Sequence, residues 1–515
     1  MTFRRFAVVV LAFSLPAAAC SGGTTEPAAP ATSEGPPETL AFADPTLPPA
    51  GRAGGSLVLG AGPLTSFDPA RANVDSPTSL ALLDLLFDGL TALDDANEPI
   101  AALADEWTTT DNTSWTFVLA DAEFADGEPV EATDVQYSLE RLIALPNRPV
   151  GAPLAVIDSI TAGDGEVTID LTRPFAGLPS LLAAPAFGIL PDGSNGEISS
   201  GPFEVADETD EVVSLRRTDR FSGNIDGIDV LRYADEDEAF EAYLAGEVDW
   251  AVVPAGRSEE LTGELGRVHR TPLDATVFYG LNVAHPDLRN IALRQAIVLA
   301  IDSESIVAEQ FADVGSVLWG IVPPGVPGAR TDACDFRCGL AAADATGFLA
   351  EVEASGDLPT IGIDYLVDDR VELDLARAIA ADLDAIGLET ELRPGTLDEL
   401  GERILAGEHM LFRYGWIGRY SSSESWLGDA FASDGTDNVT AVNSDVVDAA
   451  LDDAREATRP TDAMTAYADA ETAVLDEYAV VPLLALDRVV AVNVRVHDYT
   501  QRANGTFDAA SVWLD

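Results

Sequence analysis

The sequence contains no lysine, so all 29 of its basic residues are arginine. It has 88 acidic residues and a formal net charge of −59 at pH 7. Nucleic-acid phosphates bind to basic patches, so this balance argues against nucleic acid as a partner. A P-loop is excluded because its motif requires lysine. Runs of acidic residues such as DEDEAFE (235–241) are interpreted as solvated surface.

Histidine and cysteine are also scarce. A metal site needs more soft ligands than the chain offers, so we expect no metal and no cofactor. Apart from Cys20, the only cysteines are Cys334 and Cys338, in the short segment CDFRC. In an exported protein, two cysteines so close together more often form a disulfide than a metal site. The closed loop is small, so the expected stabilisation is modest. The four histidines are scattered along the chain, at His269, His285, His409 and His497.

Sequence motifs of common hydrolases are missing. The chain has neither G-x-S-x-G nor H-E-x-x-H. Catalytic carboxylate pairs cannot be recognised, because 88 acidic residues supply many pairs by chance. We therefore expect that the protein is not an enzyme. An exported hydrolase is the alternative, and turnover of any substrate would favour it.

The first 20 residues have the three parts of an export signal. Arg4 and Arg5 form a short basic start, residues 6–15 are apolar, and small residues precede Cys20. The apolar run is too short to span a membrane, so it is interpreted as a secretory signal. A cysteine after small residues resembles a bacterial lipobox, although Ala17 replaces the usual leucine. We expect lipidation at Cys20 and anchoring to the outer face of the cell membrane; the alternative is a soluble secreted protein that loses Cys20.

Residues 21–53 are rich in Pro, Ala, Thr, Ser and Gly and have no apolar periodicity. This composition predicts a disordered tether, with a reach on the order of 30 Å. No later segment is apolar over 18 residues, so we expect no further membrane span.

From Gly54 the pattern becomes globular, and strand-like segments alternate with helix-like ones. Such alternation favours α/β layers over a helical bundle or a β-sandwich. Thr133 is predicted to cap the second helix. The predicted strands are 54–62, 113–120, 165–175, 275–283, 360–369 and 476–493, the predicted helices are 76–90, 131–145 and 290–302, and segments 237–254 and 374–393 are each predicted to be a helix followed by a strand.

An ordered set of motifs carries a family resemblance over more than 400 residues. The set resembles the solute-binding proteins of oligopeptide, dipeptide and nickel ABC importers, known as family 5. In the long stretch at 85–142, Asp88 replaces the glutamate that family members usually carry, and Ala120 replaces their usual arginine. The matching segments are SFDPARANVDSP (66–77), the long stretch from LLFDGL to SLERL (85–142), GPFEV (201–205), LAGEVDWAVVP (244–254), LNVAHPDLRNIALRQAIVLAIDSESIV (281–307), VPPGVPG (322–328) and VVPLL (480–484).

The resemblance implies a periplasmic-binding-protein-like fold of type II, in the large variety called cluster C. Two α/β lobes would face a cleft and share a hinge, with lobe I at 54–272 plus 486–515 and lobe II at 273–485. The protein would capture a peptide or other small solute and deliver it, as a monomer, to an ABC permease by hinge closure. Alternatives are a surface sensor without a transport role, and a member of the nickel branch that binds a metal chelate.

The segment YGWIGRYSSSESWL (414–427) sets one arginine among aromatic residues. Peptide-binding family members carry G-W-x-A-D-Y here, and the aspartate pairs with the ligand's α-amino group. In this sequence Gly415, Trp416 and Tyr420 match that motif, whereas Arg419 occupies the aspartate position. The resemblance therefore implies an anionic ligand group, because a guanidinium suits a carboxylate or phosphate. The alternative is that Arg419 pairs with a nearby carboxylate, either Glu424 or Asp429.

Further ligand-binding candidates follow from the same resemblance. Trp416 and Tyr420 would wall or stack on the ligand. Phe278, Tyr279 and Asn282 lie on the first expected crossing between lobes. The last two candidates are Trp319, before the VPPGVPG loop, and Asn438, in a polar stretch.

Overall fold

The computed structural model describes residues 54–515 except 65, 74–75, 95, 146–148, 255, 262, 335–337, 339–341 and 355. The predicted signal, the lipidation site at Cys20 and the tether at 21–53 lie outside the described residues. Within the described part, no helix has the length and apolar character needed to cross a membrane.

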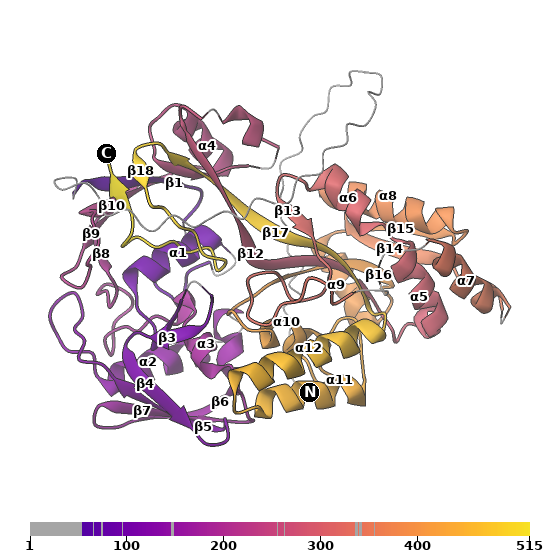
Figure 1. Cartoon of the computed structure of the whole chain (residues 1–515), viewed down its shortest axis with the longest axis horizontal. Helices are drawn as coiled ribbons and strands as arrows, with labels where there is room; N and C mark the ends of the chain where they lie inside the picture. Colours follow the sequence, from indigo (N-terminus) through magenta and orange to yellow (C-terminus); the bar gives the residue numbers. More distant parts are fainter. Residues whose placement is uncertain are drawn as a thin grey trace, which may run out of the picture.

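One 11-stranded mixed sheet runs through the molecule, and two long adjacent strands form its middle. These strands, β12 (Gly266–Leu281) and β17 (Val480–Asn493), pair antiparallel along most of their length. In Figure 1 they cross the centre of the molecule, between a part with β1 and β8–β10 and a part with β14–β16. The strand order is β15-β14-β16-β12-β17-β11-β1-β10-β9-β8, with β13 paired to β17.

The described residues also form three smaller sheets, of which the largest has the order β4-β5-β7-β6. The remaining strands of the large sheet are β1 (Ser56–Ala61), β8 (Phe203–Glu208), β9 (Val212–Arg217), β10 (Gly227–Arg232), β11 (Trp250–Val252), β13 (Gly315–Val317), β14 (Ile361–Leu366), β15 (Thr390–Gly395) and β16 (Leu411–Ile417). The smaller sheets contain β2 (Thr91–Leu93), β3 (Pro99–Ala101), β4 (Ala104–Thr109), β5 (Ser114–Leu119), β6 (Ile157–Ala162), β7 (Glu166–Leu171), β18 (Val496–His497) and β19 (Trp513–Leu514).

Twelve α-helices in the described residues cover these sheets. Three of them, α10–α12, lie beside the middle of the molecule (Figure 1). The helices are α1 (Pro77–Leu86), α2 (Ala132–Ile143), α3 (Leu178–Leu182), α4 (Glu236–Leu244), α5 (Ile291–Ala300), α6 (Ser303–Gln310), α7 (Ala342–Glu353), α8 (Arg370–Ala385), α9 (Leu397–Ala406), α10 (Glu424–Phe431), α11 (Asp445–Glu456) and α12 (Pro460–Asp476).

The predicted α/β alternation is confirmed, and three boundaries differ. Helix α1 ends at Leu86, because Phe87 is already extended. Thr133 is not the cap of α2: the helix begins after Glu131, whose backbone N–H donates to the Asp134 carboxylate at 2.7 Å. Strand β12 begins at Gly266 rather than 275, because its polar first half pairs with β17.

The pairing of β12 with β17 is interrupted at the first expected crossing between lobes. The register shifts between Pro272 and Thr276, leaving Leu273–Ala275 outside the regular ladder. The backbone of Asp274 is held from both sides: its N–H donates to Ala503 O at 3.0 Å, and its carbonyl accepts from Gly418 N at 2.7 Å. This irregularity places Asp274 where the two halves of the molecule meet.

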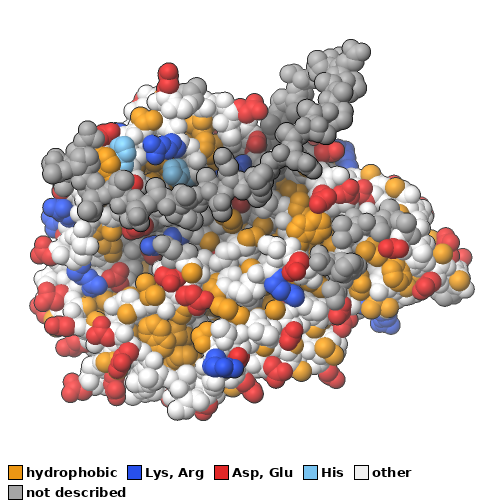
Figure 2. Space-filling view, in the orientation of Figure 1, with side chains coloured by type: hydrophobic (Ala, Val, Ile, Leu, Met, Phe, Trp, Pro, Cys, Tyr) orange, Lys and Arg blue, Asp and Glu red, His pale blue; other side chains and the backbone are white. Residues whose placement is uncertain are grey.

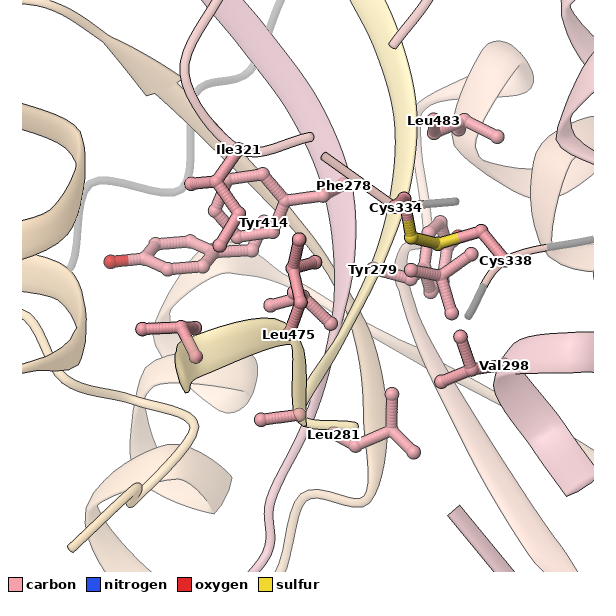
Figure 3. Close-up of a cluster of buried hydrophobic side chains, with 14 of the residues drawn as sticks. Phe278, Tyr279, Leu281, Val298, Ile321, Cys334, Cys338, Tyr414, Leu475 and Leu483 are labelled. Atoms are coloured by element: carbon pink, nitrogen blue, oxygen red, sulfur yellow. A yellow bond between two sulfur atoms is a disulfide. The ribbon is translucent and has the colours of Figure 1, made fainter. Parts of the chain in front are cut away.

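A large hydrophobic core surrounds the second half of β12. Phe278 and Tyr279, with 1% and 0% of their surface exposed, point to opposite sides of the strand (Figure 3). The Phe278 ring packs edge-on against Tyr414 at a centroid distance of 4.9 Å. Tyr279 lies beside a disulfide that joins Cys334 to Cys338, with the two Cα atoms 5.6 Å apart.

We predict that removing this disulfide has a modest effect on stability. The bond closes a loop with a sequence separation of 4, so chain entropy gives a stabilisation of about 2 kcal/mol. A Cys334→Ala/Cys338→Ala variant should lose about that amount in urea-induced unfolding. Adding a reductant should lower the stability of the wild type and leave that of the variant unchanged; a loss several times larger would show that the bond organises its surroundings.

Candidate functional site

A partly open, mostly apolar cavity of about 80 Å³ lies where the two halves meet. We call it the interlobe pocket. One wall comes from α1, β2, the α3 region and the C-terminal segment, and the other from the start of β12 and the connection between β16 and α10. The lining residues are Leu80, Leu93, Val150, Ser180, Ala184, Pro185, Ala186, Phe187, Leu273, Asp274, Ala275, Ile417, Gly418, Arg419, Tyr420, Ser421, Ala503 and Asn504.

Two glycines permit close approaches at this junction. A Cβ on Gly418 would lie 2.0 Å from the Trp426 ring, so a side chain there would displace the ring. Gly325, in the VPPGVPG loop, has φ of +106°, and a Cβ there would lie 3.1 Å from Ala503 Cβ. Asn97 Nδ2 donates to Gly325 O at 2.6 Å, so this loop contacts the half of the molecule that contains β2 and β3.

Arg419 lines the interlobe pocket and stacks on an aromatic ring. Its guanidinium carbon lies 5.5 Å from the centroid of Trp416, within the range of a cation–π contact. Its backbone N–H donates to Ser425 Oγ at 3.2 Å. Among the described residues, no carboxylate forms a salt bridge with it. Burial raises the pKa of Asp429 and of Asp437, and the positive charge of Arg419 opposes both shifts.

Glu424, one of the two partners expected for Arg419, is instead held by other residues. Its Oε1 accepts from Arg455 Nη2 at 2.8 Å and from Arg173 Nη2 at 3.1 Å. Its Oε2 accepts from the Tyr467 hydroxyl at 3.2 Å. Arg173 follows β7 on the opposite wall, so this buried carboxylate links the two halves. The other expected partner, Asp429, interacts with Arg419 only at longer range.

A second, polar cavity of about 430 Å³ adjoins the interlobe pocket through Tyr420. We call it the polar chamber. Five carboxylates and two arginines line it, so an empty chamber favours cationic groups. Its charged residues are Glu424, Asp429, Asp434, Asp448, Asp452, Arg173 and Arg455.

Asp274 is the buried acid of the interlobe pocket. Only 5% of its surface is exposed, and its Oδ1 has no hydrogen-bond partner among the described residues. Burial raises its pKa from 3.8 to about 7, and the nearby Ser421 hydroxyl opposes the shift without forming a hydrogen bond of ordinary geometry. No arginine contributes to the shift. This carboxyl therefore lacks the cation that would favour its charged form.

Of the eight predicted ligand residues, two line the interlobe pocket and a third packs against one of them. Arg419 and Tyr420 line the pocket, and the Trp416 ring, of which only 4% is exposed, contacts the Arg419 guanidinium from outside the lining. The Tyr420 ring packs edge-on against Phe175 of the opposite wall, with a centroid distance of 6.0 Å.

The other five line neither cavity, and each has a structural role in the described residues. Phe278 and Tyr279 fill the core around β12. Asn282 donates to the carbonyls of Gly407 and His409 and accepts from Ala284 N. The remaining two are Trp319, which packs against the large core and accepts from Cys334 N, and Asn438, which bonds within its own loop to Ala432, Thr440 and Val442.

Asp274 and Arg173 were missed by the sequence analysis. Asp274 stands in TPLDATVFYG, directly before the apolar half of β12. An acid at the start of a buried strand is a weak signal, and 87 other acids obscure it. Arg173 gives no signal at all, because its partner Glu424 is 251 residues away.

Comparisons with known proteins agree with this two-lobed arrangement. Residues 98–438 match the family model described as bacterial extracellular solute-binding proteins, family 5. The chain belongs to this family. It is 26% identical over 445 residues to the periplasmic oligopeptide-binding protein OppA of Escherichia coli K12, covering 77% of this chain and 81% of OppA.

Solved structures of family members share its two-lobed fold. The unliganded open form of the murein tripeptide-binding protein MppA has a TM-score of 0.80 at 20% identity, covering 90% of this chain and 98% of MppA. AgaA from A. tumefaciens R10, in complex with agropinic acid, has a TM-score of 0.69 at 20% identity. The match covers 90% of this chain and 99% of AgaA. The protein is thus a solute-binding protein of the kind that serves ABC importers, and its relatives are binding proteins rather than enzymes.

The raised pKa of Asp274 predicts a pH dependence of folding. The folded state keeps this proton up to about pH 7, whereas the unfolded state loses it near pH 4, so stability falls between these values. Asp274→Asn, which mimics the neutral acid, removes this fall. Relative to the variant, the ligand-free wild type should lose up to about 4 kcal/mol in urea unfolding between about pH 4 and about pH 8.

The matched control for this measurement is Asp374→Asn, which changes an exposed acid on α8. Its stability should follow that of the wild type across the same pH range. A constant difference between wild type and Asp274→Asn would show that Asp274 is charged in the folded protein.

We further predict unequal roles for the two arginines at Glu424. Arg455 is 10% exposed and Glu424 4%, so Glu424→Gln leaves the buried cation with only the exposed Asp452 as a carboxylate partner and should cost about 3–5 kcal/mol. Arg173 is 40% exposed, so Arg173→Gln should cost less than about 1 kcal/mol. Urea unfolding measures both. Equal losses would mean that the contact between walls, rather than the buried pair, carries the stability.

Proposed function

We propose that this protein is a substrate-binding lipoprotein of an ABC importer. It captures a peptide or another small solute in the interlobe pocket and delivers it to the membrane permease. The lobes are residues 54–272 with 486–515, and residues 273–485, joined by β12 and β17. Lipidation of Cys20 and the tether at 21–53 hold the receptor at the outer face of the cell membrane.

Arg419 supports a ligand that carries an anionic group. The guanidinium lies in the pocket wall, is positioned by the Trp416 ring and has no salt bridge among the described residues. A carboxylate or phosphate that enters the pocket would meet donors already in place. Tyr420 closes the same wall and faces both the pocket and the polar chamber. One similar protein, AgaA, has been solved in complex with agropinic acid, so acidic solutes occur among the proteins that share this fold.

Native mass spectrometry of the gently purified fragment 51–515 tests this proposal. The wild type should carry an acidic solute, and Arg419→Gln should bind that solute about 10- to 100-fold more weakly, because it loses a charged hydrogen-bonding partner. Arg419→Asp should lose it completely, since it adds a third carboxylate near Asp429 and Asp437.

Arg377→Asp, which changes an exposed arginine of α8 by the same charge, is the control and should bind as the wild type does. A ladder of peptides that is equal in wild type and in both Arg419 variants would contradict the anionic assignment. It would leave peptide capture as the function.

A further inference from the structure

Eight carboxylates in the described part of the chain are buried, and seven of them are satisfied. Six pair with an arginine, and the seventh, Asp134, accepts two backbone N–H groups, from Glu131 and Asp192. The six ion pairs are Asp68–Arg141, Asp249–Arg495, Asp364–Arg393, Glu372–Arg413, Glu424–Arg455 and Glu471–Arg330.

Asp274 is the exception. Its Oδ1 is buried without a hydrogen bond, and none of the described arginines pairs with it. Burying a carboxyl in this way is unfavourable, because the group loses hydration and gains no partner. The backbone of Asp274 already makes both of its hydrogen bonds. The carboxyl is therefore not needed to hold the chain in place.

The location of this carboxyl suggests its partner. Asp274 and Arg419 line the same pocket. The pKa of Asp274 is shifted by burial and by Ser421, with no contribution from Arg419, so the two side chains do not neutralise each other. The rest of the lining is largely apolar, and Tyr420 lines both this pocket and the acid-rich polar chamber.

We propose that Asp274 is a specificity-determining residue that binds an ammonium-type cation of the ligand. With Arg419 as the anion-binding group, the interlobe pocket selects a dipolar solute with an apolar body, such as an amino acid or a short peptide in its zwitterionic form. This inference rests on the proposed function, because it assigns the second charged group of the same site. The ammonium replaces the proton that the empty protein holds on Asp274.

Two matched sets of probes test the assignment by thermal shift and calorimetry. The sets are leucine and leucyl-leucine, each as the free zwitterion, as the N-acetyl derivative without a cation, and as the C-terminal amide without an anion. In the wild type, at least one zwitterion should bind about 10- to 100-fold more tightly than its N-acetyl derivative. In Asp274→Asn, which keeps the shape of the side chain, this preference should disappear.

Proton release gives an independent readout. Near pH 7, binding of the zwitterion to the wild type should release about half a proton, because Asp274 is half protonated there. Calorimetry in two buffers of different ionisation enthalpy measures this number. Asp274→Asn should release none. Asp382→Asn is the matched control: it alters another carboxyl whose pKa is raised by burial, on α8 and outside both cavities, and it should behave as the wild type.

The outcomes separate this inference from the proposed function. If N-acetyl and free forms bind equally while the amides bind weakly, Asp274 is excluded and the anionic role of Arg419 stands. If the amides bind as well as the zwitterions while the N-acetyl forms bind weakly, Arg419 is excluded and Asp274 stands. The inference is overturned if no probe stabilises the wild type, or if the zwitterion preference survives in Asp274→Asn.

Discussion

The antiparallel pairing of β12 with β17 is the constraint on which the rest of this structure depends. Both strands run through the middle of the large sheet, and the remaining strands add to it on either side. A shift in their register between Pro272 and Thr276 releases three residues from the ladder. The middle one, Asp274, hydrogen-bonds through its backbone to Ala503 on one side and to Gly418 on the other. The position of the pocket therefore follows from a local irregularity in the strand pair.

Electrostatics gives this pocket its chemical character. The chain has a net charge of −59, and in Figure 2 acidic side chains (red) are spread over the visible face, whereas arginine side chains (blue) are few. Most of the buried acids hold one of the scarce arginines, as Glu424 holds Arg455. Asp274 lacks such a partner, and Arg419 has no salt bridge among the described residues. One apolar cavity is thus lined by a buried acid without a cationic partner and by an arginine without a salt bridge, whereas most other buried acids of the described residues pair with an arginine.

Much of the fold could be predicted because its signals are local. Alternating and helical spacings identified β5, β14, α5 and α8, and an ordered set of motifs indicated the family. The predicted site was less complete. Trp416, Arg419 and Tyr420 lie close together in sequence and were recognised through one motif, but Phe278 and Tyr279 were expected at the ligand and instead fill the core. These neighbours face opposite sides of β12, and the local sequence does not show that core packing covers both sides of the strand.

The sequence by itself determined the class of the protein, the order of its elements and the place of one unusual arginine. These follow from composition, periodicity and short motifs, which act over a few residues of chain. Only the tertiary structure decided which charges are satisfied. Glu424 meets Arg173 across 251 residues, whereas Asp274 meets no cation in the part of the chain that the structure describes. The interaction between two charges depends on their distance in space, and spacing along the chain does not encode that distance. Burial makes a paired charge more favourable and an unpaired charge more costly.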